Sequence, residues 1–202
     1  MRIHQVCLIL VLGLGSPLLL ANPAYPGYYP APQYQAPDNM LRGGLDKVIA
    51  FLASGQVQDP QQLQAFVEQE LAPYFDFEYM NQWVMGSLQR HMSPHQVTDM
   101  QQRLRGMFLQ AMARQLASYR HGRIQYLRPR GNPASGEVSL GIRVYSHQGY
   151  ATRLDFRLYQ GEQGWKVFDV VADGQSVVAH YRALFARRGI MGGQAAAYPH
   201  RH

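Results

Sequence analysis

The chain has 202 residues, a hydrophobic content of 47% and a formal net charge of +6 at pH 7, and this length suffices for one domain with its own apolar core. Its single cysteine, Cys7, lies in the N-terminal apolar segment, so disulfides, thiol catalysis and cysteine-based metal sites are excluded once that segment is removed. Lys47 and Lys166 are the only lysines, so arginine carries most of the basic charge. A basic surface suits nucleic acid, anionic lipid or an acidic partner protein, and genome composition would also favour Arg over Lys.

Residues 1–21 have the pattern of a secretory signal peptide. A basic start at Arg2 precedes an apolar run, Val6 to Ala21, that is interrupted by glycine and proline. This run is too short and too broken for a membrane span. We expect cleavage after Ala21 or Ala24 and export of a soluble protein.

Two low-complexity segments flank the expected domain. Residues 22–39 contain five prolines and four tyrosines without helical or strand periodicity, which predicts an extended or disordered tether. Residues 189–202 form a second tail, in which His200 and His202 are too weak a pattern to predict a metal site. The folded domain is therefore expected over residues 40–188.

The periodicity of the domain indicates helices first and strands later. Apolar spacing predicts helices over 41–52, 63–71 and 73–86, the last stopped by Gly86. Ser93, Pro94 and Gln96 form a capping box that starts a long helix to about Tyr119.

Four runs then alternate as strands, over residues 123–129, 137–145, 152–159 and 165–171. Strict alternation favours a curved antiparallel sheet with one dry face. A turn at 172–175 leads into a C-terminal helix, so the sequence predicts an α+β fold with helices packed on one face of a four-stranded sheet.

Motifs for catalysis and nucleic-acid binding are weak. Asp155 is expected in a surface ion pair with its neighbours Arg153 and Arg157, and Asp169 either caps, pairs with a cation or acts as a base. No nucleophile elbow, P-loop or dinucleotide fingerprint occurs. The basic and aromatic residues of 119–130 fit a solvated strand face better than a nucleic-acid site.

Two segments carry a specific motif pattern. In 74–86, Phe75-Asp76-Phe77 is followed by a helix end at Met85-Gly86. The matching residues of 164–185 are Trp165, Lys166, Val167, Phe168, Asp169, Gly174, Ser176, His180, Tyr181, Arg182 and Phe185. Together they resemble the MlaC family of periplasmic phospholipid-binding proteins, also called toluene-tolerance auxiliary proteins, over about residues 40–188.

This resemblance implies a periplasmic phospholipid carrier and not an enzyme. Its cargo would be a glycerophospholipid, with acyl chains in an apolar cavity between helices and sheet and no cofactor. Its partners would be an inner-membrane ABC transporter with MCE-domain subunits and an outer-membrane lipoprotein complex, and the transport would maintain outer-membrane lipid asymmetry. A monomer without nucleic-acid partners is expected. The residues expected to line the cavity are Met80, Val84, Leu104, Phe108, Met112, Leu140, Ile142, Leu154, Phe156, Val170 and Tyr181.

Two other function classes stay open at this point. One is a small-molecule lyase or isomerase on a similar cone-shaped α+β fold, with Asp169 as the base. The other is a structural envelope protein anchored through the Pro/Tyr-rich segment.

Overall fold

The computed structural model describes residues 32–118, 123–145 and 151–187. Its α-helices are α1 (Gln35–Ala53), α2 (Pro60–Phe66), α3 (Phe77–Met85), α4 (Pro94–Ser118) and α5 (Val177–Arg187). A π-helical turn (Val67–Leu71) continues α2, and 3-10 turns occupy Pro32–Tyr34, Gln56–Gln58, Ala72–Tyr74, Gly86–His91 and Pro133–Ser135. The strands are β1 (Arg123–Tyr126), β2 (Arg130–Asn132), β3 (Glu137–Tyr145), β4 (Ala151–Gly161), β5 (Gly164–Ala172) and β6 (Gln175–Ser176).

The strands form one antiparallel sheet in the order β1-β3-β4-β5-β6, with β2 paired beside β1 along β3. The expected α+β class, the C-terminal helix and the strand runs over 137–145, 152–159 and 165–171 are confirmed. The run expected over 123–129 is confirmed only in part, because β1 ends at Tyr126. The sheet is larger than expected because the short strands β2 and β6 add to the four. A bulge on β5 at Phe168 shifts the pairing from Arg157↔Asp169 to Leu158↔Val167.

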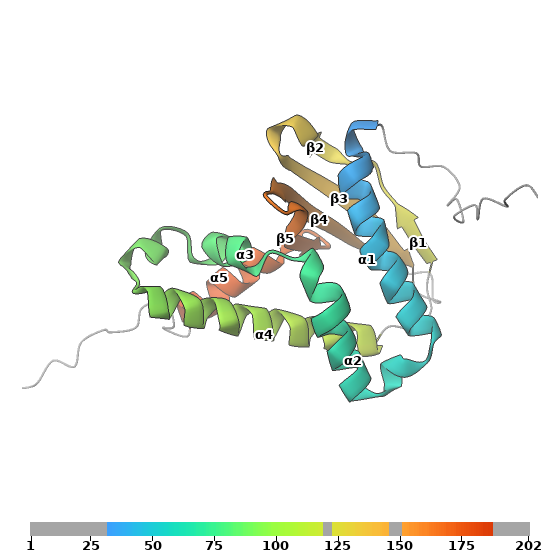
Figure 1. Cartoon of the computed structure of the whole chain (residues 1–202), viewed down its shortest axis with the longest axis horizontal. Coiled ribbons are helices and arrows are strands. Elements are labelled where there is room, and N and C mark those ends of the chain that lie inside the picture. Colours follow the sequence, from blue (N-terminus) through green and yellow to red (C-terminus); the bar gives the residue numbers. More distant parts are fainter. Residues whose placement is uncertain (1–31, 119–122, 146–150, 188–202) are drawn as a thin grey trace, which may run out of the picture.

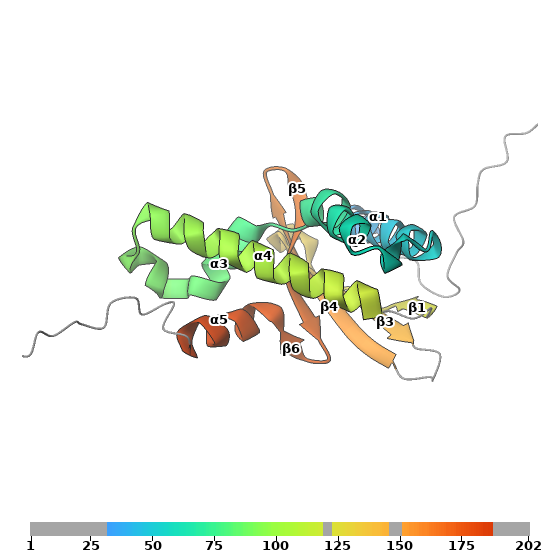
Figure 2. The same ribbon diagram turned by 90° about the horizontal axis from the view of Figure 1, so that it is seen from below.

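Helices α1 and α2 lie on one side of the sheet, and α4 crosses the same side at its other end (Figures 1 and 2). This side, the inner face, carries Val138, Leu140, Ile142 and Leu158, which are at most 4% exposed. Alternation along each strand thus places the apolar residues beneath the helices, as a half-buried sheet requires.

The first helix begins earlier than the sequence indicates. The extended segment expected over 22–39 is wrong for 32–39, because α1 starts at Gln35 after a 3-10 turn. Pro37 lies in the first turn, where a helix tolerates proline because no backbone donor is lost. Asp38 is 3% exposed, and its carboxylate accepts a 2.5 Å hydrogen bond from Arg42 Nε. Residues 1–31, with the expected signal peptide, and the tail 189–202 lie outside the described residues.

The long helix α4 is set by the expected capping box. The Ser93 N–H donates to Gln96 Oε1 over 2.8 Å, and the Gln96 N–H donates to Ser93 Oγ over 3.3 Å. These bonds satisfy backbone donors that a helix start leaves free. Its inner stripe, with Met100, Leu104 and Leu109 at most 2% exposed, packs among the other helices.

The core consists of three apolar clusters that share members. The largest joins α2, α3, α4 and α5, the second joins α1 to the centre of the sheet, and the third lies under β1 and β3. Phe75 and Val170 touch both the first and the second cluster, and Phe156 touches the second and the third. The inner face of β4 and β5 is therefore where the helical layer and the sheet meet.

Candidate lipid-binding interior

All the residues expected to line an apolar cavity are buried or half-buried. The helical ones belong to the largest cluster, where Met80, Val84 and Leu104 have no exposed surface. The sheet residues among them lie on the inner face, in the second and third clusters. Phe108 and Tyr181 are 6% exposed, Leu140 is 2% and Ile142 1% exposed, and Met112, Leu154, Phe156 and Val170 are half-buried. Contact of these residues with a ligand stays a prediction.

The inner face is unevenly covered. Leu158 of β4 is fully buried and Val167 of β5 is 2% exposed, whereas Leu154, Phe156 and Val170 on the same face stay half-buried. These three residues, here called the inner-face group, occupy interior positions: Phe156 pairs with Leu140 on one side and Val170 on the other. Interior sheet positions in a filled core are close-packed. Partial exposure at this position therefore marks apolar surface that no described side chain covers.

The corner between β5 and α5 is structural. Asp173 and Gly174 both have positive φ (47° and 87°) and make a two-residue hairpin between β5 and β6. The buried Asp169 carboxylate accepts from Ser176 Oγ at 2.7 Å and from the Val178 N–H at 3.1 Å. Ser176 Oγ in turn accepts from the Ala179 N–H at 3.1 Å. The two side chains together cap α5. Asp169 Oδ2 also lies 3.4 Å from Arg157 Nη1, so Asp169 has both the capping role and the ion-pair role expected of it.

Tyr181 lies in the core, whereas its neighbour Arg182 lies at the end of helix α3. Tyr181 packs in the largest cluster, and burial raises the pKa of its phenol. The Arg182 guanidinium donates to the backbone carbonyls of Trp83 and Val84 at the end of α3. These carbonyls have no intrahelical donor, so Arg182 completes the helix end and ties α5 to α3.

The Phe75-Asp76-Phe77 motif anchors α3 to the sheet. Asp76 Oδ1 accepts from the Tyr79 N–H at 2.8 Å as the N-cap of α3, and its N–H donates to Val167 O of β5 at 3.0 Å. Its other oxygen, Oδ2, accepts from the Tyr159 hydroxyl of β4. Burial and this bond raise the pKa of Tyr159. Phe75 and Phe77 both lie against Phe108 of α4, with ring centroids 4.9 Å and 5.7 Å away.

Asp155 is more buried than the sequence indicates. It is 8% exposed and accepts from Arg153 Nε and from Arg130 Nη2, each at 2.8 Å. Arg153, and then Arg130, hold the pKa of Asp155 below its usual value. Arg157 was expected as its partner but pairs with Asp169 at 3.4 Å instead.

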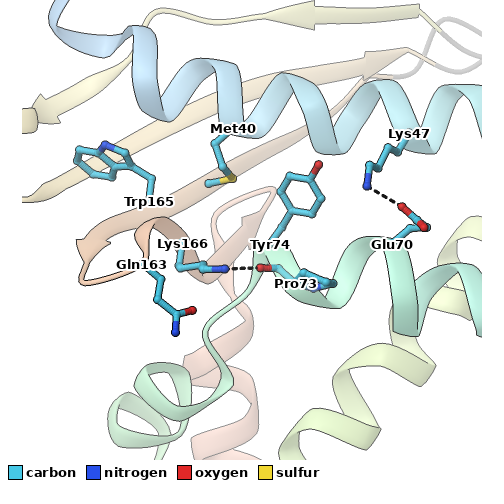
Figure 3. Close-up of a pocket in the computed structure, with 8 residues that line it drawn as sticks. All are labelled: Met40, Lys47, Glu70, Pro73, Tyr74, Gln163, Trp165 and Lys166. Carbon is cyan, nitrogen blue, oxygen red and sulfur yellow. Dashed lines mark hydrogen bonds and ion pairs between the residues drawn. The ribbon is translucent and has the colours of Figure 1, made fainter.

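A surface pocket of about 360 Å³ lies between α1, the turn at Ala72–Tyr74 and β5, and holds both lysines of the chain (Figure 3). Lys47 pairs with Glu70 at 2.6 Å, and Lys166 donates to Pro73 O at 2.7 Å. The other lining residues are Met40, Tyr74, Gln163 and Trp165. None of the expected cavity residues lines this pocket, and its ammonium groups already bind groups from neighbouring elements.

The described residues contain no cluster of three or more His, Asp or Glu side chains that could hold a metal ion. Within the same ranges, no helix is both long and apolar enough to cross a membrane.

A comparison with known families gives a match to the MlaC protein family over residues 44–189. The match extends over more than half of the sequence. The chain belongs to the MlaC family.

Individual relatives agree with this assignment. The chain is 25% identical over 149 residues to the "Intermembrane phospholipid transport system binding protein MlaC" of Haemophilus influenzae. The aligned region covers 71% of this chain and 70% of the relative. The structure of the present chain is similar to that of a phospholipid-binding protein from Ralstonia solanacearum solved in complex with a phospholipid. That similarity has a TM-score of 0.67 and 25% identity, and covers 77% of this chain and 90% of the other.

Proposed function

We propose that this protein is a periplasmic carrier of glycerophospholipid, without enzymatic activity. The observation that carries this proposal is the partial exposure of the apolar inner-face group on the face of the sheet that packs against the helices. The family match and the phospholipid bound to the Ralstonia relative support the same conclusion.

Lipid transfer through water demands such a surface. Exposing acyl chains costs about 0.8 kcal/mol per methylene, on the order of 20 kcal/mol for two ordinary chains. A carrier must replace nearly all of this burial, and no catalytic group is needed. The acyl chains would lie against Leu154, Phe156 and Val170, with Met112 of α4 as an adaptable neighbour.

The family resemblance suggests the donor and acceptor of the lipid. They would be an outer-membrane lipoprotein complex and an inner-membrane ABC transporter with MCE-domain subunits, with exchange maintaining outer-membrane lipid asymmetry. The name of the Haemophilus relative, an intermembrane transport binding protein, supports this placement.

The lyase or isomerase alternative has less support because Asp169 is fully buried and its carboxylate binds Ser176, Val178 and Arg157. A general base needs access to a substrate proton. An Asp169→Asn variant that folds and still binds lipid would argue further against this alternative.

Native mass spectrometry of the purified full chain tests the proposal. We expect a co-purified phospholipid, and uptake by the delipidated protein from phosphatidylethanolamine and phosphatidylglycerol vesicles. Absence of both would overturn the carrier function.

Substitutions in the inner-face group test where the lipid binds. Phe156→Asp places a charge in the inner-face group and is expected to abolish lipid retention. Leu88→Asp is the matched control, since Leu88 is 41% exposed in the turn after α3. If Phe156→Asp fails to fold, Val170→Phe fills the same space with an apolar ring and is expected to reduce uptake. Full lipid loading of folded Phe156→Asp or of Val170→Phe would place the lipid elsewhere.

A further inference from the structure

The face of the sheet opposite the inner face, here called the outer face, carries a row of arginines across adjacent strands. Arg143 of β3 and Arg153 and Arg157 of β4 alternate with the inward residues Ile142, Leu154 and Leu158. The arginine face is defined as Arg123 of β1, Arg130 of β2, Arg143, Arg153 and Arg157.

Two of these arginines oppose each other directly. Arg143 and Arg153 are cross-strand partners in the β3–β4 register. Like charges in this position destabilise a strand pair. Arg143 is exposed and has no ionic partner among the described residues, so folding alone gives no reason for its charge.

The carboxylates on the outer face neutralise only part of the charge of the arginine face. Asp155 lies under Arg130 and Arg153 with 8% exposure, and Asp169 lies under Arg157 with none. Two exposed carboxylates lie on the same side of the sheet, Glu137 at the start of β3 and Asp173, whose Oδ1 accepts from the Arg153 N–H at 2.8 Å. The five arginines still outnumber these four carboxylates. The carboxylates hold guanidinium groups in place, and the guanidinium groups present positive charge to the solvent.

Aromatic rings border the row at both ends. The Arg123 guanidinium lies 4.7 Å from the ring of Tyr145, and that of Arg157 lies 5.5 Å from the ring of Trp83. Trp83 is 37% exposed and stacks on Phe168. Arginine, tyrosine and tryptophan are the residue types that dominate protein–protein binding energy.

We propose that the arginine face docks an acidic surface of a partner protein. The proposal rests on the carrier function, because the partner is a lipid donor or acceptor complex. A protein fits better than a bilayer for two reasons. Planar guanidinium groups on a rigid sheet bind carboxylates in fixed geometry. The other exposed large apolar side chains of the described residues, Ile49 and Leu88, lie on α1 and the turn after α3, away from this face.

The test compares two double variants of the full chain. Arg123→Gln/Arg143→Gln removes two charges from the arginine face, and Arg103→Gln/Arg187→Gln removes two exposed charges from α4 and α5. The probe is the detergent-solubilised transporter with MCE-domain subunits from the same organism, immobilised for binding at a series of salt concentrations. We expect the first variant to bind about tenfold more weakly and with less salt dependence, and the second to bind like the wild type.

Stability and lipid loading are measured on the same samples. The first variant is expected to unfold at an equal or higher denaturant concentration, because it relieves the Arg143–Arg153 repulsion. Lipid retention by native mass spectrometry is expected to be unchanged. Wild-type protein that docks through the arginines but neither co-purifies with lipid nor takes it up from vesicles would overturn the carrier function alone.

Several outcomes would overturn the docking proposal. Equal weakening by both variants would mean a general charge effect, and no weakening by the first would mean a different docking surface. Failure of the wild type to bind the transporter would show that the transporter is not the partner of the arginine face. Loss of binding only to phosphatidylglycerol vesicles would identify a bilayer as the occupant.

Discussion

Two carboxylates, the buried Asp169 and the half-buried Asp76, hold helices of this protein to its sheet. Asp169 caps α5, and Asp76 joins the start of α3 to Val167 and Tyr159. Asn81 of α3 differs from both: it is 2% exposed, its Nδ2 donates to Met85 Sδ at 3.0 Å, and its Oδ1 has no partner within the described part of the chain. A buried oxygen without a donor costs free energy that the fold does not recover at this position.

Replacing Asn81 by leucine is therefore expected to leave the free energy of unfolding equal or raise it by about 1 kcal/mol, because the unsatisfied oxygen disappears. Urea denaturation of delipidated protein measures the change. Asn81→Asp is the comparison and is expected to destabilise, since it buries a charge without a cation. A loss of more than about 1 kcal/mol in the leucine variant would show that Asn81 makes a needed polar interaction.

At the scale of elements, helix ends determine how the chain turns back on itself. Helix α3 ends at Gly86, whose φ of 54° and ψ of −132° are strained for other residues. Arg182 of α5 binds the carbonyls just before this turn. The end of α3 thus depends on one glycine and on a side chain distant in sequence.

Gly86→Ala is expected to lower the free energy of unfolding by about 1–3 kcal/mol, from backbone strain. A Cβ there would meet Arg182 Nη2 at 3.9 Å, an ordinary contact, so crowding does not contribute. Gly106→Ala in the interior of α4 is the matched control, with no atom within 4 Å of the new Cβ. It should stabilise by about 0.5–1 kcal/mol, as measured by thermal or urea unfolding. Equal effects of both substitutions would contradict this account.

At the scale of the molecule, α1 covers a part of the inner face that the largest cluster does not reach. Leu41 packs with Val138, Leu140 and Leu158, and the ring of Tyr126 receives the Arg42 guanidinium at 3.7 Å. The first turn of α1 contributes through the Asp38–Arg42 pair and the Tyr34 hydroxyl, which donates to Gly131 O at 2.7 Å. The folded unit therefore includes residues before position 40.

A chain beginning at Pro32 is expected to keep the full stability and lipid binding of the longer protein. A chain beginning at Met40 loses the Asp38–Arg42 and Tyr34 contacts and is expected to be less stable by about 1–3 kcal/mol. Urea denaturation and native mass spectrometry compare the two. Equal stability of both would show that the start of α1 is dispensable.

Periodicity predicted the elements where the local pattern was undisturbed. The run at 137–145 coincides with β3, and the capping box at Ser93 set the start of α4. The signal on β5 was weak because its bulge buries Val167, Phe168 and Asp169 in succession. The prolines of 32–39 suggested an extended segment, although a first helical turn accepts them.

The amino-acid sequence by itself determined the α+β class and the MlaC resemblance, because alternation, caps and motif spacing are local properties of the chain. The expected cavity residues were also restricted to inward faces by that spacing. Only the tertiary structure decided that Asp169 caps α5, that Arg182 completes α3, and that part of the inner face stays uncovered. These facts depend on contacts between residues far apart in the chain, which periodicity does not specify.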